Sequence, residues 1–182
     1  MDRRSALIQM GMTAGGILAF TACWNKDKEA ISKAYSKLGI TETEVGFVRN
    51  LGEVIIPSDA QVKGSDDLDL EAFVLLMVND CMKKDEQDLY MNGLRTFRKT
   101  VENQHLKEKE LEEALIAGLD GNDEDPAQKS VKKFLSVTKQ YVIQGFLTSK
   151  YFMTEIMPYE IMPGKFDGKF PITPGHKVNI YG

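Results

Sequence analysis

The chain has 182 residues, of which 42% are apolar, 27% charged and 9% aromatic, a composition typical of a globular protein of one domain with appendages. It has 23 basic against 27 acidic residues, a net charge of −4, and no basic block, which argues against nucleic-acid binding. Two cysteines and two histidines are too few for a disulfide framework, a four-cysteine zinc site or a histidine-rich metal centre.

Residues 1–22 are predicted to be an export signal. Arg3 and Arg4 precede a stretch from Ser5 to Asn25 that has no charged residue and contains three glycines. A positive start followed by a modest apolar segment is typical of export signals, and this segment is too short and glycine-rich for a membrane span. The paired arginines resemble a twin-arginine signal, which exports folded proteins. The alternative is the first core helix of a cytosolic protein.

The sequence Phe20-Thr21-Ala22-Cys23 resembles a bacterial lipobox. Cleavage before Cys23 would leave a lipid-modified N-terminus, and residues 23–40 would then form a linker. We therefore expect a periplasmic protein that is anchored to the membrane as a lipoprotein. The alternative is cleavage nearby and an ordinary soluble periplasmic protein. The remaining Cys81 lies in an apolar run, so we expect a small buried side chain there.

Residues 41–157 are predicted to form an all-α bundle of about five helices. The first helix begins at the capping box Thr41-x-x-Glu44 and ends before Pro57. Asp66 or Asp67 is expected to cap the second helix, which holds seven successive apolar residues.

Three more helices follow in the same region. The third follows Asp85, with Tyr90 and Phe97 among the residues on its apolar face. The fourth runs through Leu111 and Leu119. The fifth is long, is capped by Asp125 with Pro126 at its first position, and carries an apolar stripe that is predicted to continue to Phe152.

Residues 158–182 are predicted to be an extended C-terminal arm. They contain four of the chain's six prolines, four glycines and several aromatic residues. Proline blocks a helix, and the apolar content is too high for a solvated linker. The arm therefore lies either on its own bundle or on a partner protein. The residues predicted to make the partner interface are Tyr151, Phe152, Tyr159, Met162, Phe166, Phe170 and Ile172.

No catalytic, cofactor-binding or metal-ligating residue is predicted in this chain. The dinucleotide motif Gly-x-Gly-x-x-Gly, the haem motif Cys-x-x-Cys-His and the nucleophile motif Gly-x-Ser-x-Gly are all absent. His105 is expected to be a solvated residue at a helix end. The acidic segment Asp120–Asp125 does not have the glycine and glutamate that a calcium loop needs, so it is predicted to be an interhelical turn.

Three stretches of the chain resemble subunit 3 of the gluconate 2-dehydrogenase family. The first is the Asp2-Arg3-Arg4 start with its apolar run. The second is Leu-Gly-Glu-Val-Ile-Ile-Pro-Ser-Asp at residues 51–59. The third is Gly-Phe-Leu-Thr-Ser-Lys-Tyr-Phe at residues 145–152, continuing through Pro-Gly-Lys-Phe-Asp-Gly at residues 163–168.

This resemblance implies a non-catalytic small subunit that accompanies a separate flavin-containing sugar or polyol dehydrogenase, often with a cytochrome c subunit. FAD is then expected in the partner and not in this chain. The small subunit would assist assembly and escort the folded partner through the twin-arginine pathway. The alternative is a stand-alone periplasmic lipoprotein that binds a ligand or a protein. An enzyme in its own right is the third hypothesis.

Overall fold

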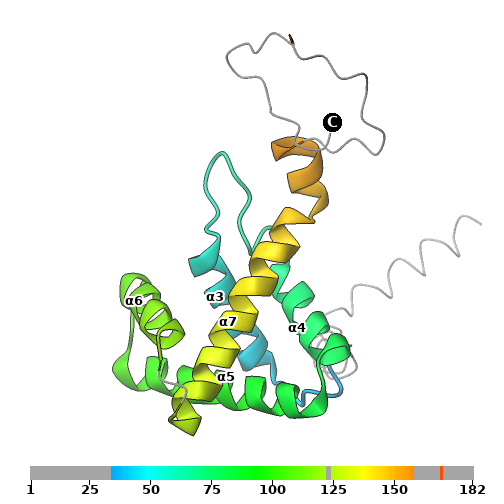
Figure 1. Cartoon of the computed structure of the whole chain (residues 1–182). Coiled ribbons are helices and arrows are strands. Elements are labelled where there is room, and N and C mark those ends of the chain that lie inside the picture. Colours follow the sequence, from blue (N-terminus) through cyan, green and yellow to red (C-terminus); the bar gives the residue numbers. More distant parts are fainter. Residues whose placement is uncertain (1–33, 122–123, 158–168, 170–182) are drawn as a thin grey trace, which may run out of the picture.

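The computed structural model describes residues 34–121, 124–157 and Lys169 (Figure 1). These residues form helices and no strand, which confirms the predicted all-α fold. The predicted export signal and, apart from Lys169, the predicted arm lie outside the described residues. The elements are α3 (Glu42–Ile55), α4 (Leu70–Cys81), α5 (Lys84–Gln104), α6 (Glu108–Leu119), α7 (Pro126–Leu147) and a short π-helix η2 (Phe152–Ile156).

Helix α7 is the centre of the bundle. It packs against α3, α4, α5 and α6, and Figure 1 shows it in yellow, running between α6 and α4 and crossing α5. Phe134, Leu135 and Val142 of α7 are almost completely buried. Burial of this apolar surface is the main force that holds the five helices together.

Helices α5 and α7 approach each other closely at Gly93. A Cβ atom on Gly93 would lie 2.0 Å from the carbonyl oxygen of Ser130, so only glycine fits there. One turn away, the rings of Tyr90 and Phe134 meet edge to face with centroids 5.1 Å apart. The buried hydroxyls of Tyr90 and Thr138 lie 3.1 Å apart and form a hydrogen bond. The α5–α7 interface therefore combines a close backbone contact at Gly93 with a buried hydrogen bond between Tyr90 and Thr138.

Two predicted helix starts are confirmed. The Glu44 amide donates to the Thr41 hydroxyl at 3.3 Å, and the Thr41 amide donates to the Glu44 carboxylate at 2.8 Å. At the start of α7, the Ala127 amide donates to the Asp125 carboxylate at 3.0 Å, and Pro126 occupies the first turn. Each cap satisfies backbone groups that the helix itself leaves unpaired.

The predicted cap of α4 is wrong. Asp69 precedes α4, with a left-handed φ of 49° and no side-chain capping bond. The two predicted caps have other partners: Asp67 accepts from the Gly64 amide at 3.3 Å, and Asp66 lies 3.4 Å from the Arg49 guanidinium. The carboxylates that were predicted to cap α4 are thus used elsewhere: Asp66 in an ion pair with α3, and Asp67 in a hydrogen bond within the loop.

The prediction of a buried Cys81 is also wrong. Cys81 is exposed and is the last residue of α4. Its sulfur lies 3.9 Å from the sulfur of Met77, one turn earlier. The apolar run suggested burial, but the helix reaches solvent at its final turn.

The last predicted helix is shorter than its apolar stripe. Helix α7 ends at Leu147, before Phe152. The Thr148 hydroxyl donates to the Gln144 carbonyl at 2.8 Å, and the Ser149 hydroxyl donates to the Phe146 carbonyl at 2.7 Å. These local side-chain bonds compete with the regular helix ladder and explain the break.

The chain enters the bundle through residues 34–40, the end of the segment that was predicted to be a linker. Leu38 and Ile40 are buried in the core. Gly39 between them has a φ of +56°, a conformation that glycine adopts without strain. The Lys37 amide donates to the Asn79 side chain at 3.1 Å, which fixes this entry against α4.

Candidate functional site

Apolar side chains reach solvent at the C-terminal end of α7. Ile143 is 38% exposed and Leu147, one turn later, is 46% exposed. The half-buried Tyr151 and Phe152 follow at the start of η2. We call Ile143, Leu147, Tyr151 and Phe152 the terminal surface. It lies where α7, yellow in Figure 1, continues into the orange segment that contains η2. Exposed aliphatic side chains that are followed by partly exposed aromatic ones at one end of a helix favour a protein-binding surface.

Tyr151 joins the terminal surface to the segment between α3 and α4. The Lys63 amide donates to the Tyr151 hydroxyl at 3.3 Å, and this hydroxyl donates to the Gln61 carbonyl at 3.5 Å. The Lys63 ammonium lies 5.4 Å from the centre of the Tyr151 ring, within the range of a cation–π interaction. Tyr151 is therefore held by its own chain along one edge.

Phe152 is held by α7. Its ring meets the ring of Phe146 edge to face, with centroids 5.4 Å apart. The Phe152 amide donates to the Ser149 hydroxyl at 3.1 Å. The aromatic side chain is half-buried, so only part of its surface is left for a partner.

The loop at residues 57–65 is ordered by carboxylates. Glu53 accepts from the backbone amides of Ser58 and Asp66, at 2.5 and 3.0 Å. Asp59 accepts from the amides of Gln61 and Val62, at 2.7 and 2.6 Å, and these two bonds lower the pKa of Asp59 below its usual value. An exposed loop fixed in this way presents one surface to a partner at a low entropic cost.

Most of the predicted functional residues lie outside the described part of the chain. Of the predicted interface, the structure places Tyr151 and Phe152 next to each other. The others, and the predicted export and lipidation residues, are not described: Tyr159, Met162, Phe166, Phe170, Ile172, Arg3, Arg4 and Cys23.

Sequence reasoning did not identify three contributors to this site: Ile143, Leu147 and Lys63. A helical projection of α7 contains a signal for the first two, because they lie four residues apart and follow the polar residues Ser136 and Lys139 on the same side of the helix. No local pattern points to Lys63, which meets Tyr151 from 88 positions away in the sequence.

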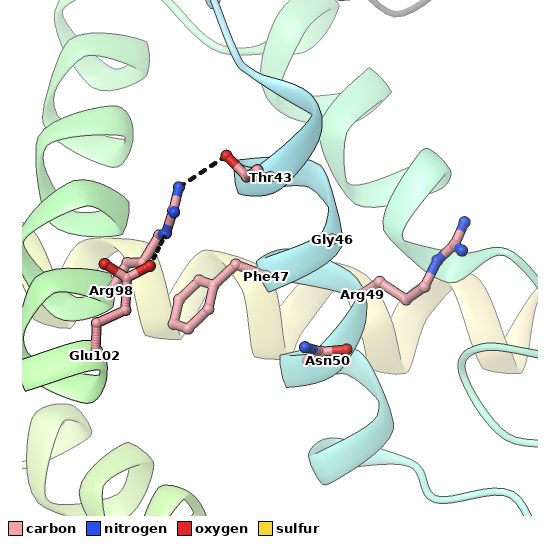
Figure 2. Close-up of a pocket in the computed structure, with 7 residues that line it drawn as sticks. All are labelled: Thr43, Gly46, Phe47, Arg49, Asn50, Arg98 and Glu102. Atoms are coloured by element: carbon pink, nitrogen blue, oxygen red, sulfur yellow. Dashed lines mark hydrogen bonds and ion pairs between the residues drawn. The ribbon is translucent and has the colours of Figure 1, made fainter. Parts of the chain in front are cut away.

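A second surface feature is a shallow depression of about 360 Å³ between α3 and α5 (Figure 2). Phe47 points from α3 toward α5, and the side chain of Arg98 extends from α5 toward Thr43 of α3. Arg98 donates to Thr43 at 3.1 Å and to Glu102 at 2.6 Å. Because Glu102 already balances the charge of Arg98, the depression is not built to hold a free anion.

Two nearly buried carboxylates pair with half-exposed arginines. Arg95 donates to Glu44 at 2.9 Å and ties α5 to α3, and Arg49 donates to Glu71 at 3.0 Å and ties α3 to α4. Burial alone would raise the pKa of Glu44, but the hydrogen bonds from Arg95 and Thr41 outweigh it and lower this pKa. These pairs orient helices against one another.

Residues 34–121, 124–157 and 169 contain no group of three or more His, Cys, Asp or Glu side chains that could hold a metal ion. No helix in this same part of the chain is long and apolar enough to cross a membrane. The surface features described above are the terminal surface, the ordered loop beside it and the α3–α5 depression.

The helical part of the chain matches a known protein family. The model of the family described as gluconate 2-dehydrogenase subunit 3 matches residues 42–164, about two thirds of the chain. The match includes all five helices, the ordered loop and the terminal surface. No curated protein and no solved structure gives a significant match.

Proposed function

Because the chain belongs to the gluconate 2-dehydrogenase subunit 3 family, we propose that it is the non-catalytic small subunit of a flavoprotein dehydrogenase complex that oxidises a sugar or a gluconate-type substrate. The family is that of an accessory subunit in a multi-subunit gluconate dehydrogenase. In this proposal the catalytic chain carries FAD, and a cytochrome c subunit accompanies it. The small subunit supplies a folded helical body that binds the catalytic chain.

The single observation that carries this proposal is the terminal surface. Ile143 and Leu147 expose aliphatic area beside two aromatic rings, and the adjoining loop is ordered without being part of the core. Burial of such area against a second protein is favourable by about 25 cal/mol per Å² before the cost of association is subtracted. The aromatic residues of the arm at 158–182 would extend the same interface.

Export and anchoring are further parts of the proposal. Arg3 and Arg4 would direct the folded complex through the twin-arginine pathway, and Cys23 would carry the lipid that attaches it to the periplasmic face of the membrane. The support is the sequence pattern at residues 1–23. Changing Arg3 and Arg4 together to lysine is expected to leave both this chain and the catalytic chain in the cytoplasm. Continued export of the catalytic chain would contradict the escort role.

The proposal is tested by isolating the native complex. The chain, tagged after Gly182, is purified from solubilised membranes at its native expression level, and the visible spectrum of the product is recorded. We expect a larger chain in a one-to-one ratio and the absorption bands of a flavin. A colourless single chain would contradict the proposal and favour the alternative, a stand-alone periplasmic lipoprotein that binds a ligand or a protein.

A further inference from the structure

The segment from α7 to the start of η2 carries only positive charge. Residues 126–154 contain five lysines and no aspartate or glutamate, although the whole chain has 27 acidic against 23 basic residues. Helix α6 before it is different, since it holds four glutamates and one lysine. A basic segment in an acidic protein is a polarised distribution of charge, and it attracts a partner of the opposite sign.

Two exposed lysines of this segment flank the aliphatic residues of the terminal surface. Lys139 comes one turn before Ile143, so both lie on the same side of α7. Lys150 follows Leu147 by three residues, just beyond the end of α7. The apolar side chains thus have a lysine before them and a lysine after them along the chain.

A third lysine comes from the ordered loop. The Lys63 ammonium lies 5.4 Å from the centre of the Tyr151 ring, and the Lys63 amide donates to the Tyr151 hydroxyl at 3.3 Å. These two contacts place this exposed lysine beside the terminal surface. We call Lys63, Lys139 and Lys150 the basic rim.

The basic rim has no carboxylate partner within the described part of the chain. The ion pairs there involve other cations, among them Lys37, Arg49, Lys84, Arg95, Arg98 and Lys133. The loop carboxylates of Glu53 and Asp59 accept hydrogen bonds from backbone amides instead. Three ammonium groups around an apolar centre are complementary to a protein surface that carries carboxylates around an apolar group.

We propose that the basic rim binds an acidic edge of the catalytic chain, with Ile143 and Leu147 packed on an apolar group inside that edge. This inference rests on the proposed function, because it assigns the chemistry of the partner surface at the same site. Opposite charges around an apolar centre speed the encounter of two proteins and fix the orientation in which they dock. The basic rim would therefore select the partner, and the aliphatic side chains would supply buried area.

An anionic lipid surface is complementary to the same charges, but two observations favour a protein. The chain as a whole has a net charge of −4, which opposes its approach to an anionic membrane, whereas a local acidic edge meets only the basic rim. The terminal surface also offers little apolar area for insertion into lipid. Its two aromatic side chains are half-buried against their own chain, which leaves mainly Ile143 and Leu147.

Cross-linking of the native complex tests the contact without any substitution. A carbodiimide joins a lysine amine directly to a carboxylate that touches it, and peptide mass spectrometry identifies the two residues. We expect links from Lys139 and Lys150 to aspartate or glutamate residues of the larger, flavin-containing chain. Lys99 on α5 and Lys129 at the other end of α7 are exposed controls, and we expect no such link from them. The proposal is overturned if the basic rim forms no link to the larger chain, or links no more often than the controls.

Charge reversal measures what the basic rim contributes. Lys139→Glu with Lys150→Glu is compared with Lys99→Glu and Lys129→Glu, a control pair that changes the net charge equally. We expect the first pair to reduce the co-purifying flavin-containing chain at least fivefold at about 50 mM salt and less than twofold at about 500 mM, because salt screens the new repulsion. The control pair should have little effect at either concentration. No loss for the first pair, or an equal loss at both concentrations, would overturn the proposal.

These outcomes separate this inference from the proposed function. If the starting chain co-purifies with no flavin-containing chain, the proposed function fails and this inference fails with it. If the starting and reversed chains retain that partner equally, only the acidic edge is refuted. The vesicle experiment uses the chain with Cys23→Ser, which carries no lipid. Its binding to phosphatidylglycerol vesicles, abolished by the charge reversal and without any cross-link in the complex, would overturn the proposal in favour of a lipid surface.

Discussion

The hydroxyl of Tyr151 accepts a hydrogen bond at 3.3 Å from the backbone amide of Lys63, although 88 positions separate the two residues in the sequence. The Lys63 ammonium also lies 5.4 Å from the centre of the Tyr151 ring. One tyrosine thus connects the segment after α7 to the loop between α3 and α4. The terminal surface and this loop are therefore linked through Tyr151.

Tyr151→Phe is expected to loosen the loop without unfolding the bundle. The substitution removes the hydroxyl that Lys63 and Gln61 contact and keeps the ring against the lysine. We expect a loss of stability of about 0.5–1 kcal/mol, because two long, exposed, neutral hydrogen bonds are lost. Amide hydrogen exchange is the direct measurement: Lys63 should exchange several-fold faster, and Gln87 on α5 should not change. Unchanged exchange at Lys63 would mean that Tyr151 does not hold the loop.

Gly93→Ala and Gly46→Ala are a matched pair, because the same substitution is made at a tightly packed position and at an open one. The new Cβ atom would collide with the Ser130 carbonyl at position 93 and would meet nothing within 4 Å at position 46. We expect Gly93→Ala to lower the free energy of unfolding by about 2 kcal/mol or more, because α5 and α7 must separate. Gly46→Ala should instead raise it by about 0.5–1 kcal/mol through better helix propensity. Urea unfolding measures both values, and equal effects would contradict the α5–α7 packing.

Glu44→Gln is expected to change how stability depends on pH. The pKa of Glu44 lies below its ordinary value of 4.5 in the folded chain. A lowered carboxyl pKa contributes stability that is present above about pH 4.5 and is lost as pH falls through the folded value. The variant should therefore be less stable than the starting chain by about 1–2 kcal/mol at pH 7, where the bonds to Arg95 and Thr41 are charge-assisted.

The difference between the two chains should shrink as the pH falls to 3. Other carboxylates with lowered pKa, such as Asp59 and Glu86, titrate in both chains, so the comparison isolates Glu44. Chemical denaturation at several pH values measures it. A difference that stays constant from pH 7 to pH 3 would show that the charge of Glu44 does not stabilise the fold.

Much of the fold follows from local sequence signals. The capping box of Thr41 and Glu44 and the Asp125-Pro126 start act through contacts within one helical turn, so sequence alone identifies them. The apolar stripes of α5 and α7 predict which faces are buried, and Tyr90 and Phe134 are accordingly in the core. Periodicity is sufficient for these features because each depends on few neighbouring residues.

The errors and omissions have long-range causes. Asp66 does not cap α4 because it lies beside Arg49 of α3. Capping predictions consider only residues within one helical turn, so they do not detect this ion pair. The exposure of Cys81 depends on where α4 ends relative to the other helices. Lys63 meets Tyr151 only after five helices have packed, so this part of the site is a product of the tertiary structure.

The most direct test of the proposed function is a comparison of exposed apolar residues in the native complex. Ile143→Glu with Leu147→Glu places two charges on the terminal surface, and Ile116→Glu with Leu76→Glu places two charges at similarly exposed sites on α6 and α4. The amount of flavin-containing chain that co-purifies from solubilised membranes is measured for each pair. We predict at least a tenfold loss for the first pair and little change for the second. Equal retention by both pairs would contradict the terminal surface as the place where the catalytic chain binds.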